Sequence, residues 1–475
     1  MSPPADQAPP LPRIQSSVPG LDEVTGGGFL KSGVYILQGS PGAGKTILAN
    51  QICHAHAAHG GRVVYVTMLA ESHARLLQHM QSFSFFAIEA LADRVHYISA
   101  FDALKSQGLA GVVNLLRGEM RAHNAGILVL DGLVMAAGAA SSDEELKLFV
   151  SDLQAHSTLT GCTTLLLTSD DADRPVSAEQ TMVDGILLLR EHAFGPRRER
   201  NIEVVKFRGS PTLRGNHAFR IGDEGIVVFP RLEAARRMHF DDQVQQEGVS
   251  SGIAGIDRMF DIGGYARGSV TAVCGPSGSG KTTLALHFAT QASAQDKALF
   301  FTFYESPEFL ARIARMQGLD PNRVFDGSAI EVMWQPFGEN LLDALAYDLL
   351  QRVADTGARR VVIDGIGGFF VAPAFHDRGG PFLGTLMNEL RRLGVTTLVT
   401  VEESSPGHRG PTDIATMSAL ADTVINLGCV RSREVQRNVW IGKSRVSRCD
   451  PAVRGITLGP SGLEVLDAPA DGDEA

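Results

Sequence analysis

A long internal repeat limits the possible folds of this chain more than any other feature. The stretch SSVPGLDEVTGGGFLKSGVYILQGSPGAGKT, residues 16–46, returns as SSGIAGIDRMFDIGGYARGSVTAVCGPSGSGKT, residues 250–282. Five landmarks recur at offsets of 233 to 237 residues, so the spacing barely drifts across a whole domain. The matched landmarks are Asp22 and Asp257, Lys45 and Lys281, Thr67 and Thr302, Asp131 and Asp364, and Lys206 and Lys443. This pattern indicates a duplicated domain with small loop insertions.

Each copy carries the phosphate-binding pattern GxxxxGK[ST] between an apolar strand-like run and a helical pattern, which is the context that the motif requires. Glycines allow backbone N–H groups to turn toward phosphate oxygens, and the start of the helix favours anions. Lys45 and Lys281 are expected to contact the β- and γ-phosphates of ATP, and Thr46 and Thr282 to bind Mg²⁺. The predicted loops are Gly39, Ser40, Pro41, Gly42, Ala43, Gly44, Lys45 and Thr46, and Gly275, Pro276, Ser277, Gly278, Ser279, Gly280, Lys281 and Thr282.

Short, β-branched apolar runs alternate with longer helical patterns within each copy. Such runs predict parallel strands covered on both faces, and the final runs, such as ILLLREH and NIEVVKF, predict antiparallel strands. We predict an α/β fold of two tandem RecA-like P-loop domains, each a mainly parallel twisted sheet flanked by helices with antiparallel strands at its end. The predicted segments are a disordered arm over 1–13, a first domain over 14–230, a linker over 231–247, a second domain over 248–467 and an acidic tail over 468–475.

Carboxylates follow two of the predicted strands in each copy. The runs ILVLD and RVVID end in Asp131 and Asp364, the Walker B pattern, in which a carboxylate at the end of a strand holds Mg²⁺. The runs VTMLAES and FTFYESP place Glu71 and Glu305 after another strand. A carboxylate there would face the γ-phosphate and activate the attacking water, although glutamate is also common at the start of surface helices.

A K-x-R motif recurs near the end of each copy, as Lys206 with Arg208 and Lys443 with Arg445. Side chains alternate along a strand, so both cations of each motif are expected on one face. The pair is poorly placed to fold back onto its own nucleotide, and it could act on a neighbour's γ-phosphate as an arginine finger. The alternative is a solvated basic edge strand.

Composition narrows the possible partners and compartment. A net charge of -10 disfavours nonspecific nucleic-acid binding, which needs clustered Lys and Arg. Five cysteines without CxxC spacing predict reduced thiols, with neither a disulfide framework nor a zinc site. The sequence shows no long apolar stretch and no secretory leader, so we expect a cytoplasmic protein without membrane association.

The paired P-loops, a G-[LI]-D ahead of each, the E-S pair after the second strand and K-x-R-G-S near the end of the first copy resemble the KaiC family of ATPases. The resemblance runs from about Ile14 to Leu466. It implies a homo-oligomer, a hexameric double ring with ATP between neighbouring subunits. It also implies slow hydrolysis, and action in circadian timing or bacterial signalling with a protein partner that the sequence leaves unknown.

The chain departs from this family at two places. The family has two adjacent glutamates where this chain has Leu69-Ala70-Glu71-Ser72 and Tyr304-Glu305. Clock members of the family phosphorylate a Ser-Thr pair that aligns with Ser418-Ala419, so only Ser418 remains as a possible phosphosite. These departures favour a KaiC-like ATPase in another signalling system.

Three other functions remain open at this point. The chain could be a Ser/Thr autokinase acting near Ser418, or an interaction scaffold that ATP stabilises without being hydrolysed. A recombinase-like DNA motor has the fold analogy in its favour and the acidic charge against it.

Overall fold

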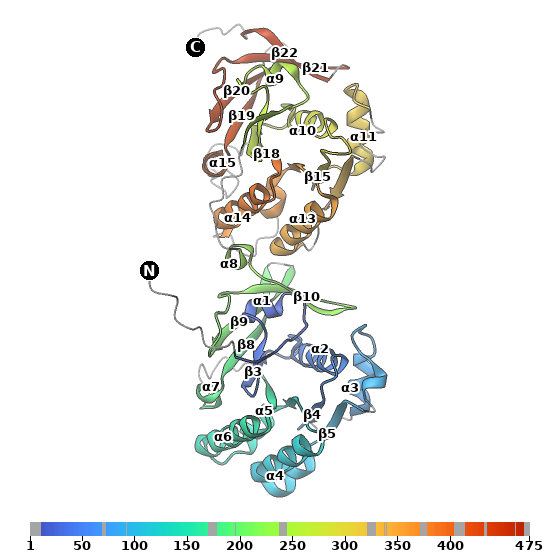
Figure 1. The fold of residues 1–475 in the computed structure, drawn as a ribbon, viewed down its shortest axis with the longest axis vertical. Helices are drawn as coiled ribbons and strands as arrows, with labels where there is room; N and C mark the ends of the chain where they lie inside the picture. The colour runs from blue at the N-terminus through green and yellow to red at the C-terminus, as the bar shows by residue number, and fades with distance from the viewer. Residues whose placement is uncertain are drawn as a thin grey trace, which may run out of the picture. The chain divides into compact units, whose positions relative to one another are not determined.

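The computed structural model divides the chain into two compact units, Met1–Ala235 and Arg236–Ala475 (Figure 1). It describes residues 11–68, 73–91, 93–169, 178–194, 196–236, 245–320, 329–336, 338, 340–370, 378–402, 414–431, 435–460 and 462–469. Of the predicted linker, Leu232–Ala235 forms helix α8, and strand β12 begins at Gln245. At the predicted N-terminal arm, Arg13 pairs with Leu30 in a short antiparallel ladder.

The first unit is built on a nine-stranded sheet with the order β11-β10-β9-β8-β3-β7-β6-β4-β5. Strands β8, β3, β7, β6, β4 and β5 run parallel, and β9, β10 and β11 extend the sheet in antiparallel pairs. The strands are β3 Val34–Gly39, β4 Val63–Thr67, β5 Val95–Ser99, β6 Ile127–Asp131, β7 Thr163–Thr168, β8 Gly185–Phe194, β9 Arg197–Phe207, β10 His217–Gly222 and β11 Gly225–Phe229, with the short pair β1 Arg13–Ile14 and β2 Phe29–Leu30. The helices are α1 Leu21–Thr25, α2 Lys45–Ala58, α3 His73–Met80, η1 Ile88–Leu91, α4 Phe101–Ala122, α5 Leu133–Ala139, α6 Asp143–Thr160 and α7 Ala178–Met182.

The second unit repeats this topology in the sheet order β16-β15-β17-β18-β14-β19-β20-β21-β22. Its strands are β14 Val270–Gly275, β15 Ala298–Thr302, β16 Ile330–Trp334, β17 Arg360–Asp364, β18 Thr396–Glu402, β19 Thr423–Arg431, β20 Val435–Ser444, β21 Arg454–Gly459 and β22 Gly462–Pro469, with the pair β12 Gln245–Val249 and β13 Tyr265–Arg267. Its helices are α9 Ala254–Asp257, α10 Lys281–Thr290, α11 Pro307–Met316, α13 Leu342–Thr356, η2 Ile366–Phe370, α14 Gly379–Arg392 and α15 Ile414–Leu420. The predicted α/β fold, with two mainly parallel sheets ending in antiparallel strands, is confirmed.

Both faces of the parallel sheet are buried, as the apolar strands predicted. In the first unit Tyr35 and Leu37 pack with α2 in one cluster, whereas Val34 and Ile36 pack with α4 and α6 in another. Neighbours along β3 therefore face opposite layers, which is the strand alternation expected for a sheet between two helical layers.

The aspartate of each G-[LI]-D landmark has a structural role in both units. Asp22 accepts hydrogen bonds from the backbone N–H and the hydroxyl of Ser16, over 2.9 and 2.7 Å. Asp257 accepts the same two bonds from Ser251, over 2.8 and 2.6 Å. These bonds satisfy backbone and hydroxyl donors at the turn into the short helix, which explains why serine and aspartate recur together.

Candidate functional site

The two phosphate-binding loops join the end of a buried strand to the start of a helix. In the first unit β3 ends at Gly39 and α2 begins at Lys45; in the second β14 ends at Gly275 and α10 begins at Lys281. The residue before each helix is glycine because its backbone is left-handed, with φ of 102° at Gly44 and 105° at Gly280. The predicted strand–loop–helix context of both motifs is therefore present.

Each P-loop lysine folds over its own loop. Lys45 Nζ donates to the carbonyl oxygens of Gly39 and Ser40 over 2.6 and 3.0 Å. Lys281 Nζ donates to those of Gly275 and Pro276, both over 2.8 Å. The ammonium groups are thus held at the loops that would receive phosphate oxygens.

The predicted magnesium ligands meet in both units although they are far apart in sequence. Thr46 Oγ1 donates to Asp131 Oδ2 over 3.3 Å, and Thr282 Oγ1 donates to Asp364 Oδ2 over 3.0 Å. Asp364 also accepts a hydrogen bond from Thr400 Oγ1 over 2.6 Å. The hydroxyls come from the start of a helix and the carboxylates from the end of a parallel strand, so the sheet topology brings them together.

Burial dominates the electrostatics of Asp364. Loss of solvent raises the pKa of this carboxyl, while the hydroxyls of Thr400 and Thr282 and the charge of Lys281 oppose the rise. A cation bound beside this buried carboxylate would stabilise its ionised form. The donor set of carboxylate and hydroxyl oxygen is one that Mg²⁺ prefers, so the residues present fit this metal.

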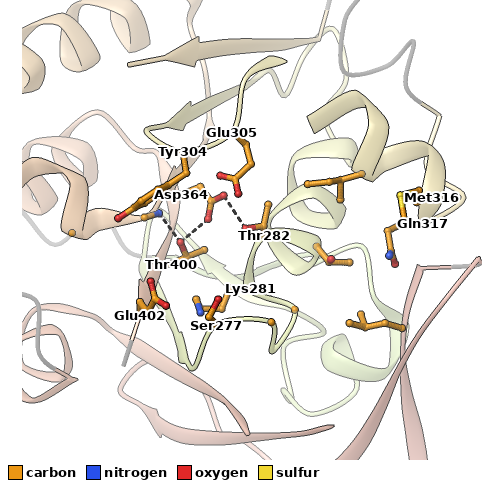
Figure 2. A pocket seen from close by; sticks show the side chains of 17 residues that line it. Ser277, Lys281, Thr282, Tyr304, Glu305, Met316, Gln317, Asp364, Thr400 and Glu402 are labelled. Atoms are coloured by element: carbon orange, nitrogen blue, oxygen red, sulfur yellow. Dashed lines mark hydrogen bonds between the residues drawn. The ribbon is translucent and has the colours of Figure 1, made fainter. Parts of the chain in front are cut away.

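A cavity of about 840 Å³ opens beside the second P-loop. Glu305, Asp364 and Thr282 are grouped in one part of it, and Met316 and Gln317 line another (Figure 2). Burial raises the pKa of Glu305, and the charge of Asp364 adds to this effect. Such a shift favours a general base beside a γ-phosphate, because a base works best when its pKa lies near the operating pH. Glu71, the candidate in the first unit, lies outside the described residues.

Several residues that line this cavity escaped sequence reasoning. Met316 ends α11, Leu458 comes from β21, and Tyr304 precedes the candidate base. The ring of Tyr304 lies against Gly365, where a Cβ would come within 2.3 Å of it. Only the identity of Tyr304, as a departure from the family pattern, gave a signal; the other two carry no local motif.

The lysine of each K-x-R motif lies on a strand, and the arginine follows the end of that strand. Strand β9 ends at Phe207 and β20 at Ser444, one residue before Arg208 and Arg445, so the shared face of the two cations stays a prediction. Each strand carries a register shift just before its lysine, at 204–206 and at 441–443. A bulge at this point redirects the following side chain.

These lysines bind the carbonyl end of a short helix. Lys206 Nζ donates to the carbonyl oxygens of Gln180 and Thr181 over 3.2 and 2.9 Å. Lys443 Nζ donates to those of Ser418 and Ala421, the latter over 3.0 Å. The candidate phosphosite Ser418 is half-buried on α15. Its backbone carbonyl contacts the lysine of the second K-x-R motif.

The K-x-R motif lies away from the P-loop of its own unit. Lys206 pairs with Ile186, which pairs with Ile36, three residues before the loop begins at Gly39. At a rise of about 3.3 Å per residue, the lysine backbone lies roughly 10 Å below the loop along the sheet. The second unit repeats this register, because Lys443 pairs with Val424 and Val424 with Ala272.

Two RecA-like sheets, each with a P-loop and a strand-end aspartate beside it, define a tandem P-loop nucleoside triphosphatase. The model of the ATPase family KaiC matches residues 14–233 and 249–470. The chain therefore belongs to the KaiC family and is an ATPase, as the sequence motifs predicted.

Curated proteins resemble the chain over nearly its whole length. The circadian clock oscillator protein KaiC of Picosynechococcus sp. is 24% identical, with 96% of this chain and 90% of that protein covered. The protein of the same name from Prochlorococcus marinus is 25% identical, with 96% and 92% covered. KaiC 1 of Synechocystis sp. is 23% identical, with 96% and 89% covered.

None of the described helices has both the length and the apolar character needed to cross a membrane. The described part of the chain contains no group of three or more His, Cys, Asp and Glu side chains that could hold a metal by themselves.

Proposed function

We propose that the chain hydrolyses ATP with Mg²⁺ at both P-loops, slowly, within a ring of identical subunits. The convergence of Lys281, Thr282, Asp364 and Glu305 on one cavity carries this proposal. Each of these groups has the chemistry that phosphoryl transfer to water needs: a cation for the phosphates, oxygen ligands for the metal, and a base.

The roles follow from position and charge. Lys281 would leave the loop carbonyls to contact the β- and γ-phosphates, and the loop N–H groups would bind the remaining phosphate oxygens. Mg²⁺ would be held by Thr282 and Asp364, where it would neutralise charge on the phosphates. Glu305 would orient the attacking water and accept its proton. In the first unit, Thr46 and Asp131 would hold the metal, and Glu71 would be the base.

The K-x-R cations would complete the site of a neighbouring subunit. The register of β9 and β20 supports this, because Lys206 and Lys443 lie about 10 Å from their own P-loops along the sheet. Arg208 and Arg445 would then stabilise charge on a neighbour's γ-phosphate. A head-to-tail interface of this kind closes into a ring, and family resemblance supports a hexamer.

Family membership also supports a role in signalling or timing through a protein partner in the cytoplasm. The relatives are named circadian clock oscillator proteins. Tyr304 and Ala419 replace residues that the kinase reaction of clock members uses, so we favour a signalling ATPase over a clock kinase.

Steady-state phosphate release tests the proposal. The comparison is between the natural chain, Lys45→Ala, Lys281→Ala and the double variant, each with Mg²⁺ and after its removal by chelation. We expect each single variant to lose part of the rate, and the double variant and the chelated samples to lose it all. A natural chain that binds ATP but releases phosphate no faster than the double variant would refute hydrolysis.

A second candidate activity is autophosphorylation at Ser418. The contact between Lys443 and the Ser418 carbonyl favours it, because the motif that would meet a neighbour's phosphates also holds this helix. Phosphopeptide mass spectrometry after incubation with ATP tests it, with Ser418→Ala as control. Absence of phosphate from residues 412–423 in the natural chain would eliminate this candidate.

A further inference from the structure

Asp422, the residue just before β19 in the second unit, is held by an arginine from α14. Arg391 donates from Nε and a terminal nitrogen to Asp422 Oδ2 over 3.1 and 3.0 Å. The same guanidinium donates to the carbonyl oxygen of Leu420 over 2.6 Å and to Asn388 Oδ1 over 2.9 Å. Asp422 Oδ2 also accepts the backbone N–H of Val270 over 2.8 Å. The ion pair is therefore mostly buried and fixed from several sides.

We call the aspartate before β19, together with the residues that contact it, the corner of the second unit. The first unit has the equivalent corner around Asp184, without this arginine. Asp184 accepts the N–H of Val34 over 2.9 Å, as Asp422 does from Val270. The helix contact to the preceding carbonyl comes from neutral Gln154, which donates to Met182 over 2.9 Å. Asp184 instead forms an ion pair with Arg208, at 3.9 Å and with an arginine side chain 59% exposed.

The two K-x-R arginines consequently differ in their surroundings. Arg208 lies beside Asp184, the carboxylate of its own unit. Arg445 is exposed, and among the described residues its guanidinium has neither a hydrogen-bond partner nor an ion-pair partner. Both arginines donate their backbone N–H to the carbonyl of the corresponding aspartate, over 2.8 and 2.9 Å, so their backbones are placed alike.

Competition for the carboxylate explains this difference. A fixed, mostly buried guanidinium that shares three acceptors is a far better partner for Asp422 than an exposed side chain making one contact. Lys443 adds a third cation to this corner, and its pKa is lowered by burial and by the charges of Arg445 and Arg391, while Asp422 opposes them. The second unit therefore presents more unbalanced positive charge here than the first.

We propose that Arg391 is a positioning residue for ATP hydrolysis: by occupying Asp422 it keeps Arg445 available for the phosphates of a neighbouring subunit. In the first unit Asp184 competes with the neighbour's phosphates for Arg208. The inference rests on the proposed function, in which the K-x-R cations act on a neighbouring site.

The test uses the full-length Lys45→Ala chain, in which phosphate release reports the second site. Arg391→Leu should lower turnover about two- to fivefold, because Arg445 then spends part of its time in an exposed ion pair with Asp422. Arg391→Lys should retain most of the rate. Adding Asp422→Asn to Arg391→Leu should restore the lost turnover. The neutral amide cannot form an ion pair with Arg445 but can still accept the Val270 N–H.

The first site offers the reverse experiment in the Lys281→Ala chain. Asp184→Asn should raise turnover about two- to fivefold by releasing Arg208. This arm does not depend on the folding of any Arg391 variant. A purely structural role of either aspartate predicts a loss instead, since the substitution weakens the corner.

The outcomes distinguish failure of the proposed function from failure of the role of Arg391 alone. Arg445→Ala should cost on the order of 10³-fold at the second site. If it costs nothing, the neighbouring-cation proposal fails, and this inference fails with it. If Arg445→Ala is severe while Arg391→Leu has no effect, only the role of Arg391 is refuted. The same holds if Asp422→Asn fails to restore the rate of Arg391→Leu. If Asp184→Asn does not raise the rate, the competition of Asp184 for Arg208 is refuted.

Discussion

The phenol of Tyr65 donates a hydrogen bond to Asp131 Oδ2 over 2.9 Å in the first unit. At the corresponding position of β15 the second unit has Phe300, and Asp364 receives its additional hydroxyl from Thr400 on the other neighbouring strand. Burial raises the pKa of Tyr65 well above its usual value, and the charge of Asp131 contributes, so the phenol remains a donor at all physiological pH values. The equivalent aspartates of the two units therefore accept this hydrogen bond from strands on opposite sides.

Removing the phenol should destabilise the first unit. We expect Tyr65→Phe to lower its stability by about 1–3 kcal/mol, because the hydrogen bond joins a fully buried donor to a carboxylate. Hydrogen exchange of the amides in β4 and β6 would measure the effect locally. Tyr97→Phe is the matched control, since that phenol donates to the neutral Asn50 side chain over 2.6 Å. Equal effects of the two substitutions would contradict a special role for the charged acceptor.

Thr400→Val should shift the pH dependence of the second site. The Thr400 hydroxyl lowers the pKa of Asp364, so its loss lets burial raise that pKa further. The carboxylate form then requires a higher pH, and the acid limb of turnover in the Lys45→Ala chain should move upward. Thr397→Val is the control on the same strand, because the Thr397 hydroxyl is buried and has no hydrogen-bond partner among the described residues. A shift of the same size in the control would refute the explanation.

Glu305→Gln should separate activity from stability. Turnover at the second site should fall by about 10²-fold or more if Glu305 is the base. Without nucleotide and metal, however, the variant should be more stable than the parent at pH 7. The pKa of Glu305 is raised in the folded chain, so folding stability declines as pH rises through that value, and glutamine removes the penalty. Below the ordinary glutamate pKa the gain should disappear.

The neighbouring Glu308 provides a control of opposite sign. Its pKa is lowered by hydrogen bonds from its own backbone N–H and from Ser306 at the start of α11. The ionised form therefore adds stability above the ordinary glutamate pKa, and Glu308→Gln should lose it at pH 7 without a large loss of turnover. Thermal unfolding at pH 4 and pH 7 would compare the two variants. A gain at pH 7 for both substitutions would argue against the burial of Glu305 as the cause.

Mixing two inactive variants would show whether the K-x-R cations act between subunits. Lys281→Ala removes a P-loop lysine and Arg445→Ala removes a K-x-R arginine, both in the Lys45→Ala background. In randomly mixed rings at equal amounts, about a quarter of the interfaces would pair an intact P-loop with an intact arginine. Phosphate release should recover to about that fraction of the parent rate. Rings mixed and shown to exchange subunits, yet still inactive, would place the arginine's action within one subunit.

Local chemistry made the P-loops and their strands predictable. The left-handed backbone at Gly44 and Gly280 favours glycine, and the continuous apolar runs before them favour buried parallel strands. The carboxylates were also predictable, since Asp131 and Asp364 end such runs. Strand alternation does not fix Arg208 or Arg445, because the strand ends at the residue before each of them.

The sequence by itself determined the duplicated α/β fold, the two nucleotide-binding loops and the aspartates beside them. These features depend on residues that are adjacent in sequence, through their backbone preferences and their apolar pattern. Only the tertiary structure decided that Tyr65 supports one aspartate and Thr400 the other, that Leu458 reaches the cavity, and that Arg391 rather than Arg445 holds Asp422. Such contacts join residues from separate helices and strands, and their distances are set by how the layers pack around the sheet.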